Sequence, residues 1–159
     1  MARRRDDEER LRAALGATRA ILRDRYGESL PPVPEVAGAV LAETVLADVL
    51  HIDDLARKRA EEPPHDRGAL RVADGELTRR LAVRAPGHSV ELRVPPYAAV
   101  QVVPGPAHTR GTPPNVVETD PVTWLRLATG RTGWAEALRA GLLSASGERA
   151  DLSGYLPLA

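Results

Sequence analysis

The sequence predicts an α+β fold: a small, mostly antiparallel sheet covered by helices, with two extra helices at the N-terminus. In the first half of the chain, apolar residues recur every three or four positions, which is typical of amphipathic helices. In the second half, Val90, Leu92 and Val94 alternate with Glu91 and Arg93, as in a strand with one solvated face. Hydrophobic residues make up 43% of the 159, so we expect a folded core.

The first predicted helix covers residues 6–25. Leu11, Leu15 and Leu22 fall on one of its faces, and most of the other positions are charged. Gly27 follows directly and predicts the end of this helix.

The second predicted helix covers residues 35–61, after a proline-rich break in the chain. Pro63 and Pro64 end it, and residues 62–68 are the best candidate for a linker. We therefore expect an N-terminal helical extension at 1–67 and a separate domain at 68–159.

That domain begins with a predicted helix to about residue 84, followed by two strands near 90–94 and 97–103 that we expect to pair antiparallel. Four prolines and two glycines in residues 104–114 predict a loop. A short strand at 115–118 comes next.

The C-terminal part carries clear helix boundaries. Asp120 followed by proline predicts a helix start, and Gly130 predicts the end of that helix. A second short helix ends at Gly141. We expect a strand at 142–146 and a final short helix at 151–155.

Composition excludes several classes of protein. The chain has no cysteine and therefore no disulfide or thiol chemistry, and its formal net charge of zero argues against nucleic-acid binding. Its apolar stretches are too short for a transmembrane span, and no continuous apolar run follows the N-terminal arginines. We expect a cytoplasmic protein without a cofactor and without integral membrane association.

One polar pair on the second helix is a candidate metal site. Asp48 and His51 are three positions apart, and Glu43 or Asp54 is available as a third ligand. Such pairs are common by chance, so we interpret this one as part of a solvated helix face. The sequence therefore predicts no metal site, and no residue pattern predicts catalysis.

The C-terminal motifs resemble those of a known family. The order strand, capped helix ending in glycine, short helix ending in glycine, strand, glycine and helix over residues 115–156 is similar to that of sterol-carrier-protein-2-like domains. Arg93-Val94-Pro95-Pro96-Tyr97 and the run from His108 to Pro121 resemble the actinobacterial sterol carrier family proteins. The resemblance covers roughly residues 68–159.

This resemblance implies an apolar tunnel between the sheet and its helices, and a lipid, fatty acid or similar small molecule as its ligand. The residues that would line the tunnel are all apolar or aromatic: Leu81, Val90, Leu92, Val100, Val102, Trp124, Leu125, Leu127, Trp134 and Leu138. The same side chains also suit an ordinary core.

His108, Arg110 and Asn115 are candidates for a polar rim, where Arg110 would hold a carboxylate or phosphate head group. The alternative is a rigid connector whose polar groups bind its own backbone.

Two other functions stay open. One is a protein-interaction module, with a homodimer formed through the N-terminal helices. The other is an accessory domain of an enzyme system, since similar domains accompany mycothiol-dependent isomerases and acetyltransferases. In a chain of 159 residues we expect no separate catalytic domain, which favours a non-catalytic binder.

Overall fold

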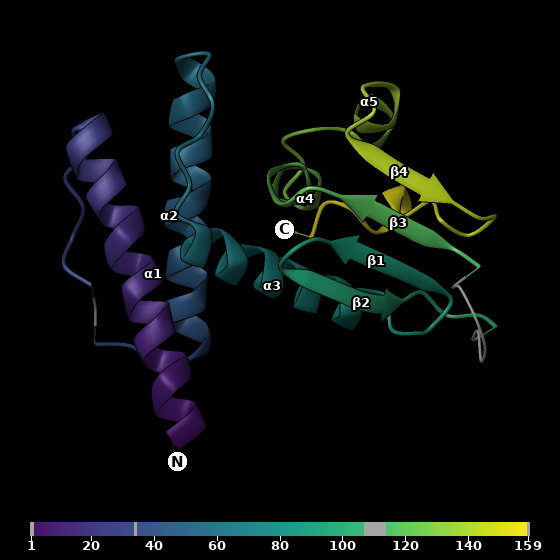
Figure 1. The fold of residues 1–159 in the computed structure, drawn as a ribbon, viewed down its shortest axis with the longest axis horizontal. Helices are drawn as coiled ribbons and strands as arrows, with labels where there is room; N and C mark the ends of the chain where they lie inside the picture. The colour runs from purple at the N-terminus through teal and green to yellow at the C-terminus, as the bar shows by residue number, and fades with distance from the viewer. Residues whose placement is uncertain (1, 34, 107–113, 159) are drawn as a thin grey trace. The chain divides into compact units, whose positions relative to one another are not determined.

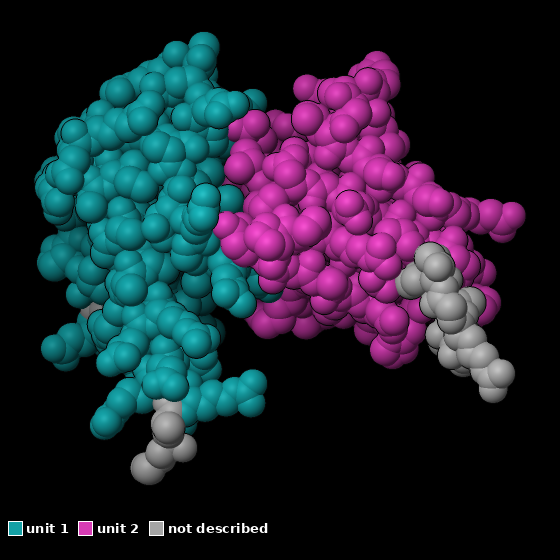
Figure 2. All heavy atoms as spheres, viewed as in Figure 1, with its two compact units in different colours: residues 1–76 teal, residues 77–159 magenta. Residues whose placement is uncertain are grey.

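The structure, a computed structural model, describes residues 2–33, 35–106 and 114–158. The chain divides into two compact units, unit 1 at residues 1–76 and unit 2 at residues 77–159 (Figure 2). The division falls inside helix α3 (Arg67–Arg84). The domain boundary predicted after residue 67 lies at the start of this helix and stays a prediction.

Unit 1 is built on two parallel helices, α1 (Ala2–Tyr26) and α2 (Ala39–Lys58). They lie side by side and run in the same direction, so the connection between them travels back along the pair (Figure 1). Leu15 and Leu22 of α1 are fully buried, as are Val45 and Ile52 of α2. The three-and-four spacing that predicted these helices therefore marks their buried faces.

Two arginines of α1 hold the returning segment. Arg12 donates to the Val36 carbonyl oxygen over 3.2 Å, and Arg19 donates to the Pro31 carbonyl oxygen over 2.6 Å. Arg19 also donates through Nε to Asp48 on α2 over 2.9 Å. A long connection that reverses direction needs partners for its backbone oxygens, and these guanidinium groups supply them.

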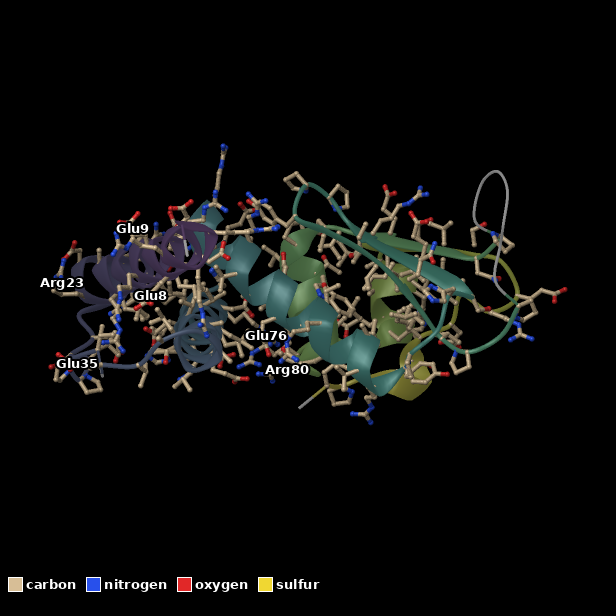
Figure 3. The ribbon with its side chains drawn as sticks, turned by 90° about the horizontal axis from the view of Figure 1, so that it is seen from below. Glu8, Glu9, Arg23, Glu35, Glu76 and Arg80 are labelled. Carbon is tan, nitrogen blue, oxygen red and sulfur yellow. The ribbon has the colours of Figure 1, made fainter. Side chains whose placement is uncertain are left out.

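A second polar group closes the other end of the helix pair. Tyr26 donates its hydroxyl to Glu61 over 2.9 Å, and Arg25 donates to the same carboxylate over 3.0 Å. The Arg25 hydrogen bond, followed by that of Tyr26, lowers the pKa of Glu61, while burial raises the pKa of Tyr26. Elsewhere in unit 1, the charged side chains of Arg23 and Glu35 are exposed and point outward (Figure 3).

Unit 2 contains a four-stranded sheet in the order β2-β1-β3-β4. Its strands are β1 (Val90–Val94), β2 (Ala98–Val102), β3 (Val116–Thr119) and β4 (Leu143–Ser146). The β1–β2 and β3–β4 pairs are antiparallel, as predicted for β1 and β2. The β1–β3 pair is parallel, with the start of β3 beside the start of β1. The sheet is therefore mixed.

One face of this sheet, which we call the inner face, is covered by helices. The unit 2 part of α3 and helix α4 (Pro121–Ala128) lie behind it, and α5 (Trp134–Arg139) lies beside β4 (Figure 1). A short 3₁₀ helix, η1 (Ser153–Tyr155), stands where a terminal helix was predicted. Among the described residues, each helix is either too short or too polar to cross a bilayer.

The ends of α4 and α5 follow the predicted signals. Asp120 caps α4 by accepting a hydrogen bond from the Thr123 backbone N–H over 3.0 Å, and proline fills the first helical position. Gly130 and Gly141 follow the two helices with φ values of 73° and 70°. These left-handed conformations end both helices at little steric cost because glycine has no Cβ.

Candidate functional site

The inner face of unit 2 brings together most of the residues predicted to line a tunnel. Seven of the ten have a relative exposure of 2% or less: Leu81, Val90, Leu92, Val102, Trp124, Leu125 and Leu127. They come from α3, from β1 and β2, and from α4. The structure therefore places them in one apolar layer between the sheet and its helices, while their role toward a ligand stays a prediction.

The other three of the ten lie nearer the surface. Val100 of β2 and Trp134 of α5 are half-buried, and Leu138 is 39% exposed. Helix α5 has only six residues, and Ala137 occupies its buried position. Leu138 therefore sits outside the layer, together with the exposed Leu142 that follows the helix.

Helix α4 is enclosed within unit 2. Five of its eight residues are buried: Thr123, Trp124, Leu125, Leu127 and Ala128. The backbone N–H of Leu158 donates to the Ala128 carbonyl oxygen over 2.8 Å, so the C-terminal segment binds the last turn of α4. Because buried residues occur around most of its circumference, α4 forms part of the interior rather than a surface cover.

Trp124 is the largest fully buried side chain of the chain's described part. Its indole Nε1 has less than 1 Å² exposed and no hydrogen-bond partner among the described residues. Buried indole N–H groups usually have an acceptor, and leaving one unpaired costs about 1–3 kcal/mol. This nitrogen is thus a polar donor placed in an apolar layer.

Of the predicted polar rim, Asn115 is described, whereas His108 and Arg110 lie outside the described residues. Asn115 is 7% exposed. Its Nδ2 donates to the Ser89 carbonyl oxygen over 2.8 Å, and its Oδ1 accepts from the Arg149 backbone N–H over 3.0 Å. Its amide therefore joins the start of β1, the start of β3 and the segment after β4.

Gly147 and Arg149 complete this junction. Gly147 has a φ of 104°, and an added Cβ would overlap the Pro114 carbonyl oxygen and the Asn115 side chain. Arg149 Nη1 donates to the Pro104 carbonyl oxygen over 3.4 Å. The backbone on both sides of residues 107–113 is thus anchored to the turn that follows β4.

The opposite face of the sheet, which we call the open face, carries polar and small side chains. Strand register places Ala99, Arg93, Glu118 and Ser144 in one row across all four strands. A second row consists of Gln101, Glu91, Val116 and Ser146. Arg93 donates to Glu91 over 2.6 Å, which neutralises both charges at the centre of this face.

Two adjoining grooves cross one end of the open face and share Pro95 and Glu118. One, of about 400 Å³, is also lined by Arg93, Pro96 and Tyr97 among others. The other, of about 390 Å³, extends to residues 119–120 and 141–144. None of the ten residues predicted to line a tunnel lines either groove, so the two faces of the sheet are separate candidates for binding.

The sequence indicated that Glu91 and Arg93 point to solvent, but it did not identify these grooves. Glu118 lies in the same row as Arg93 because β3 pairs in parallel with β1. No local sequence pattern predicts the register of this pair. The proline pair at 95–96 lines one of the grooves, but its residue types alone do not predict a groove.

The two members of the candidate metal pair have different partners. Asp48 accepts from Arg19 over 2.9 Å, and both side chains are largely buried. His51 lies 3.4 Å from Glu28. Asp48 therefore belongs to the packing of α1 against α2, whereas His51 lies near the segment that follows α1.

Comparison with known families agrees with this architecture. Residues 66–158 match the family described as bacterial SCP ortholog, where SCP stands for sterol carrier protein. No curated protein matches the chain. The family match covers α3, the whole mixed sheet, and the helices α4 and α5. Because it spans more than half of the sequence, the chain belongs to the family of bacterial SCP orthologues and carries a sterol-carrier-like domain.

Proposed function

We propose that unit 2 binds an apolar or amphipathic small molecule, such as a lipid or a fatty acid, as a non-catalytic carrier or sensor. Membership in the bacterial SCP family supports this function. The observation that carries the proposal is the apolar layer between the inner face and α4, in which Leu92, Trp124 and Leu127 are at most 2% exposed. A guest that inserts there exchanges water for aliphatic neighbours, at about 25 cal/mol per Å² of apolar surface buried.

A chain-length series tests the proposal. The purified full chain is titrated with saturated fatty acids that differ by two methylene groups, and binding is followed by calorimetry. Each buried methylene contributes about 0.8 kcal/mol, so the affinity should rise about fourfold per methylene until the site is filled. A stoichiometry of one guest per chain is expected. If binding does not saturate, or if affinity does not depend on chain length, the proposed function is wrong.

Two neighbouring positions distinguish the faces of the sheet. Val100 points to the inner face and is half-buried, whereas Ala99 lies on the open face and lines a groove. With Val100→Trp, the added ring takes space from the guest and should weaken fatty-acid binding at least tenfold. Ala99→Trp serves as the matched control and should leave the affinity unchanged. If Ala99→Trp weakens binding and Val100→Trp does not, the guest binds on the open face instead.

A second candidate function is protein interaction, and the adjoining grooves favour it. Arg93 is paired with Glu91, while Glu118 is an exposed carboxylate on the floor that both grooves share. Apolar side chains stand at either end, at Tyr97 and Leu142. Such a groove suits an extended segment with a basic side chain between apolar ones.

Light scattering of the full chain tests the simplest partner, a second copy. A mass that rises toward the dimer with concentration, and that falls back in Glu118→Arg, would support the grooves as the contact. Loss of the dimer in Val40→Asp, on an exposed position of α2, would assign it to the N-terminal helices instead. A constant monomer mass would exclude the homodimer.

A further inference from the structure

Trp124 is buried on all sides in the centre of α4. The side chain is 0% exposed, and the helix around it is held by the Asp120 cap at one end and by the Leu158 backbone at the other. Its ring position is therefore set by packing on both sides and by backbone hydrogen bonds at both helix ends. The indole nitrogen of such a ring cannot reach solvent unless the packing of the surrounding side chains is disrupted.

Several buried polar side chains near the ends of the strands have hydrogen-bond partners. Thr119 donates to the Leu142 carbonyl oxygen over 2.8 Å, and Thr123 donates to the Asp120 carboxylate. Asn115 uses both ends of its amide. Trp124 Nε1 has no acceptor among the described residues, and the buried hydroxyls of Thr78 and Ser89 also have no partner there. Unlike a hydroxyl, the indole N–H cannot rotate toward another acceptor or accept a hydrogen bond itself.

An indole N–H has restricted chemistry. It donates one hydrogen bond and accepts none, so only an acceptor can satisfy it. A carboxylate acceptor would bring a full negative charge into the apolar layer, at a cost of several kcal/mol unless it is paired. A neutral carbonyl oxygen satisfies the donor without that cost.

We infer that Trp124 is a ligand-binding residue whose indole N–H donates to a neutral carbonyl oxygen of the guest. This rests on the proposed function and makes it specific: the guest is an aliphatic ester or ketone, or a protonated acid, rather than a plain hydrocarbon. The unpaired donor then discriminates between guests of equal size, because a hydrocarbon leaves it buried and unsatisfied while a carbonyl compound pairs it.

A pair of isosteric guests tests the inference. 2-Decanone carries one carbonyl oxygen, and 2-methyl-1-decene replaces that oxygen with a CH₂ group of similar size. After correction for their different transfer from water, the wild-type chain should prefer the ketone by about five- to tenfold, the range expected for one buried hydrogen bond. In Trp124→Phe, which keeps an aromatic ring but removes the N–H, this preference should disappear. Tyr155→Phe, which removes a polar hydrogen from an aromatic side chain outside the predicted lining, is the matched control and should retain it.

The wild-type chain offers a second measurement if Trp124→Phe does not fold. The chain has two tryptophans, so its nitrogen–proton spectrum contains two indole signals, which Trp134→Phe assigns. Saturating 2-decanone should move the Trp124 indole proton downfield, as hydrogen bonding does, and 2-methyl-1-decene should not.

The outcomes separate this inference from the proposed function. If both guests bind but the ketone preference is absent, or is the same in Trp124→Phe, the donor role is wrong and the binding function stands. An indole proton that responds equally to both guests also overturns the donor role, because the response then does not depend on the carbonyl oxygen. If neither guest binds the wild-type chain, the proposed function fails, and the inference fails with it.

Discussion

The side-chain amide of Asn115 donates to the backbone carbonyl oxygen of Ser89 over 2.8 Å, and so links the parallel starts of β3 and β1. Both residues are buried, at 7% and 3% exposure. The same side chain accepts from the Arg149 backbone N–H. One amide thus joins three segments that are distant in sequence, at the end of the sheet where the parallel pair begins.

Replacing Asn115 should therefore destabilise unit 2. Asn115→Ala removes two hydrogen bonds and leaves the Ser89 oxygen and the Arg149 N–H without those partners. We expect a loss of about 2–3 kcal/mol in the free energy of unfolding, measured by urea denaturation. Ser146→Ala, at an exposed position of β4, is the control and should change it by less than about 0.5 kcal/mol. Equal effects of the two variants would contradict the junction described here.

Gly147 should tolerate no side chain. Gly147→Ala would hold alanine at a φ of 104° and press its Cβ against Pro114 and Asn115. Backbone strain and overlap together should cost about 2–4 kcal/mol of unfolding free energy. Gly154→Ala is the matched control, because its Cβ would meet open space. A thermal midpoint for Gly147→Ala within one degree of the wild type would show that the turn does not need glycine.

The Arg19–Asp48 pair should stabilise unit 1 far more than a surface pair does. The two side chains are only 15% and 12% exposed, so Arg19→Met leaves a largely buried carboxylate without its main partner. The expected loss is about 2–4 kcal/mol, and adding Asp48→Leu should restore most of it. Arg10→Met, which breaks an exposed pair with Asp7, should cost less than about 0.5 kcal/mol. Chemical denaturation of the four proteins decides the comparison.

Glu61 gives unit 1 a defined response to acid. Its pKa is lowered, first by the Arg25 hydrogen bond and then by that of Tyr26. A carboxyl whose pKa is lower in the folded state contributes stability that is complete above its ordinary pKa and is lost as pH falls through the folded value. Carboxyl titration by NMR should show the Glu61 pKa rising in Tyr26→Phe and rising further in Arg25→Ala. No change in either variant would contradict the assigned causes.

Local signals in the sequence predicted the order of helices and strands, although α2 (Ala39–Lys58) is shorter than the predicted helix at 35–61. The alternation of Val90, Leu92 and Val94 identified β1 because side chains on a strand alternate between its faces. Asp120 and Gly130 marked the ends of α4 because capping depends on a few adjacent residues. The family resemblance came from this same order of elements, and the family match confirms it.

The sequence alone did not predict which distant segments pair with one another. The parallel β1–β3 register decides which side chains share the open face, and it depends on how the chain returns after β2. The same holds for Asn115, whose residue type suits a rim as well as a buried junction. Leu138, named as a lining residue, is 39% exposed because the six-residue helix α5 buries a single position, Ala137.

The most direct test of the binding function is methyl NMR of the full chain titrated with a saturating fatty acid. If the guest enters between the sheet and its helices, the methyl signals of Leu81, Leu92 and Leu127 should shift together at one guest per chain. Those of the exposed Val40 and Val83 should stay in place. Shifts confined to exposed residues such as Leu142, with the inner layer unmoved, would contradict the account.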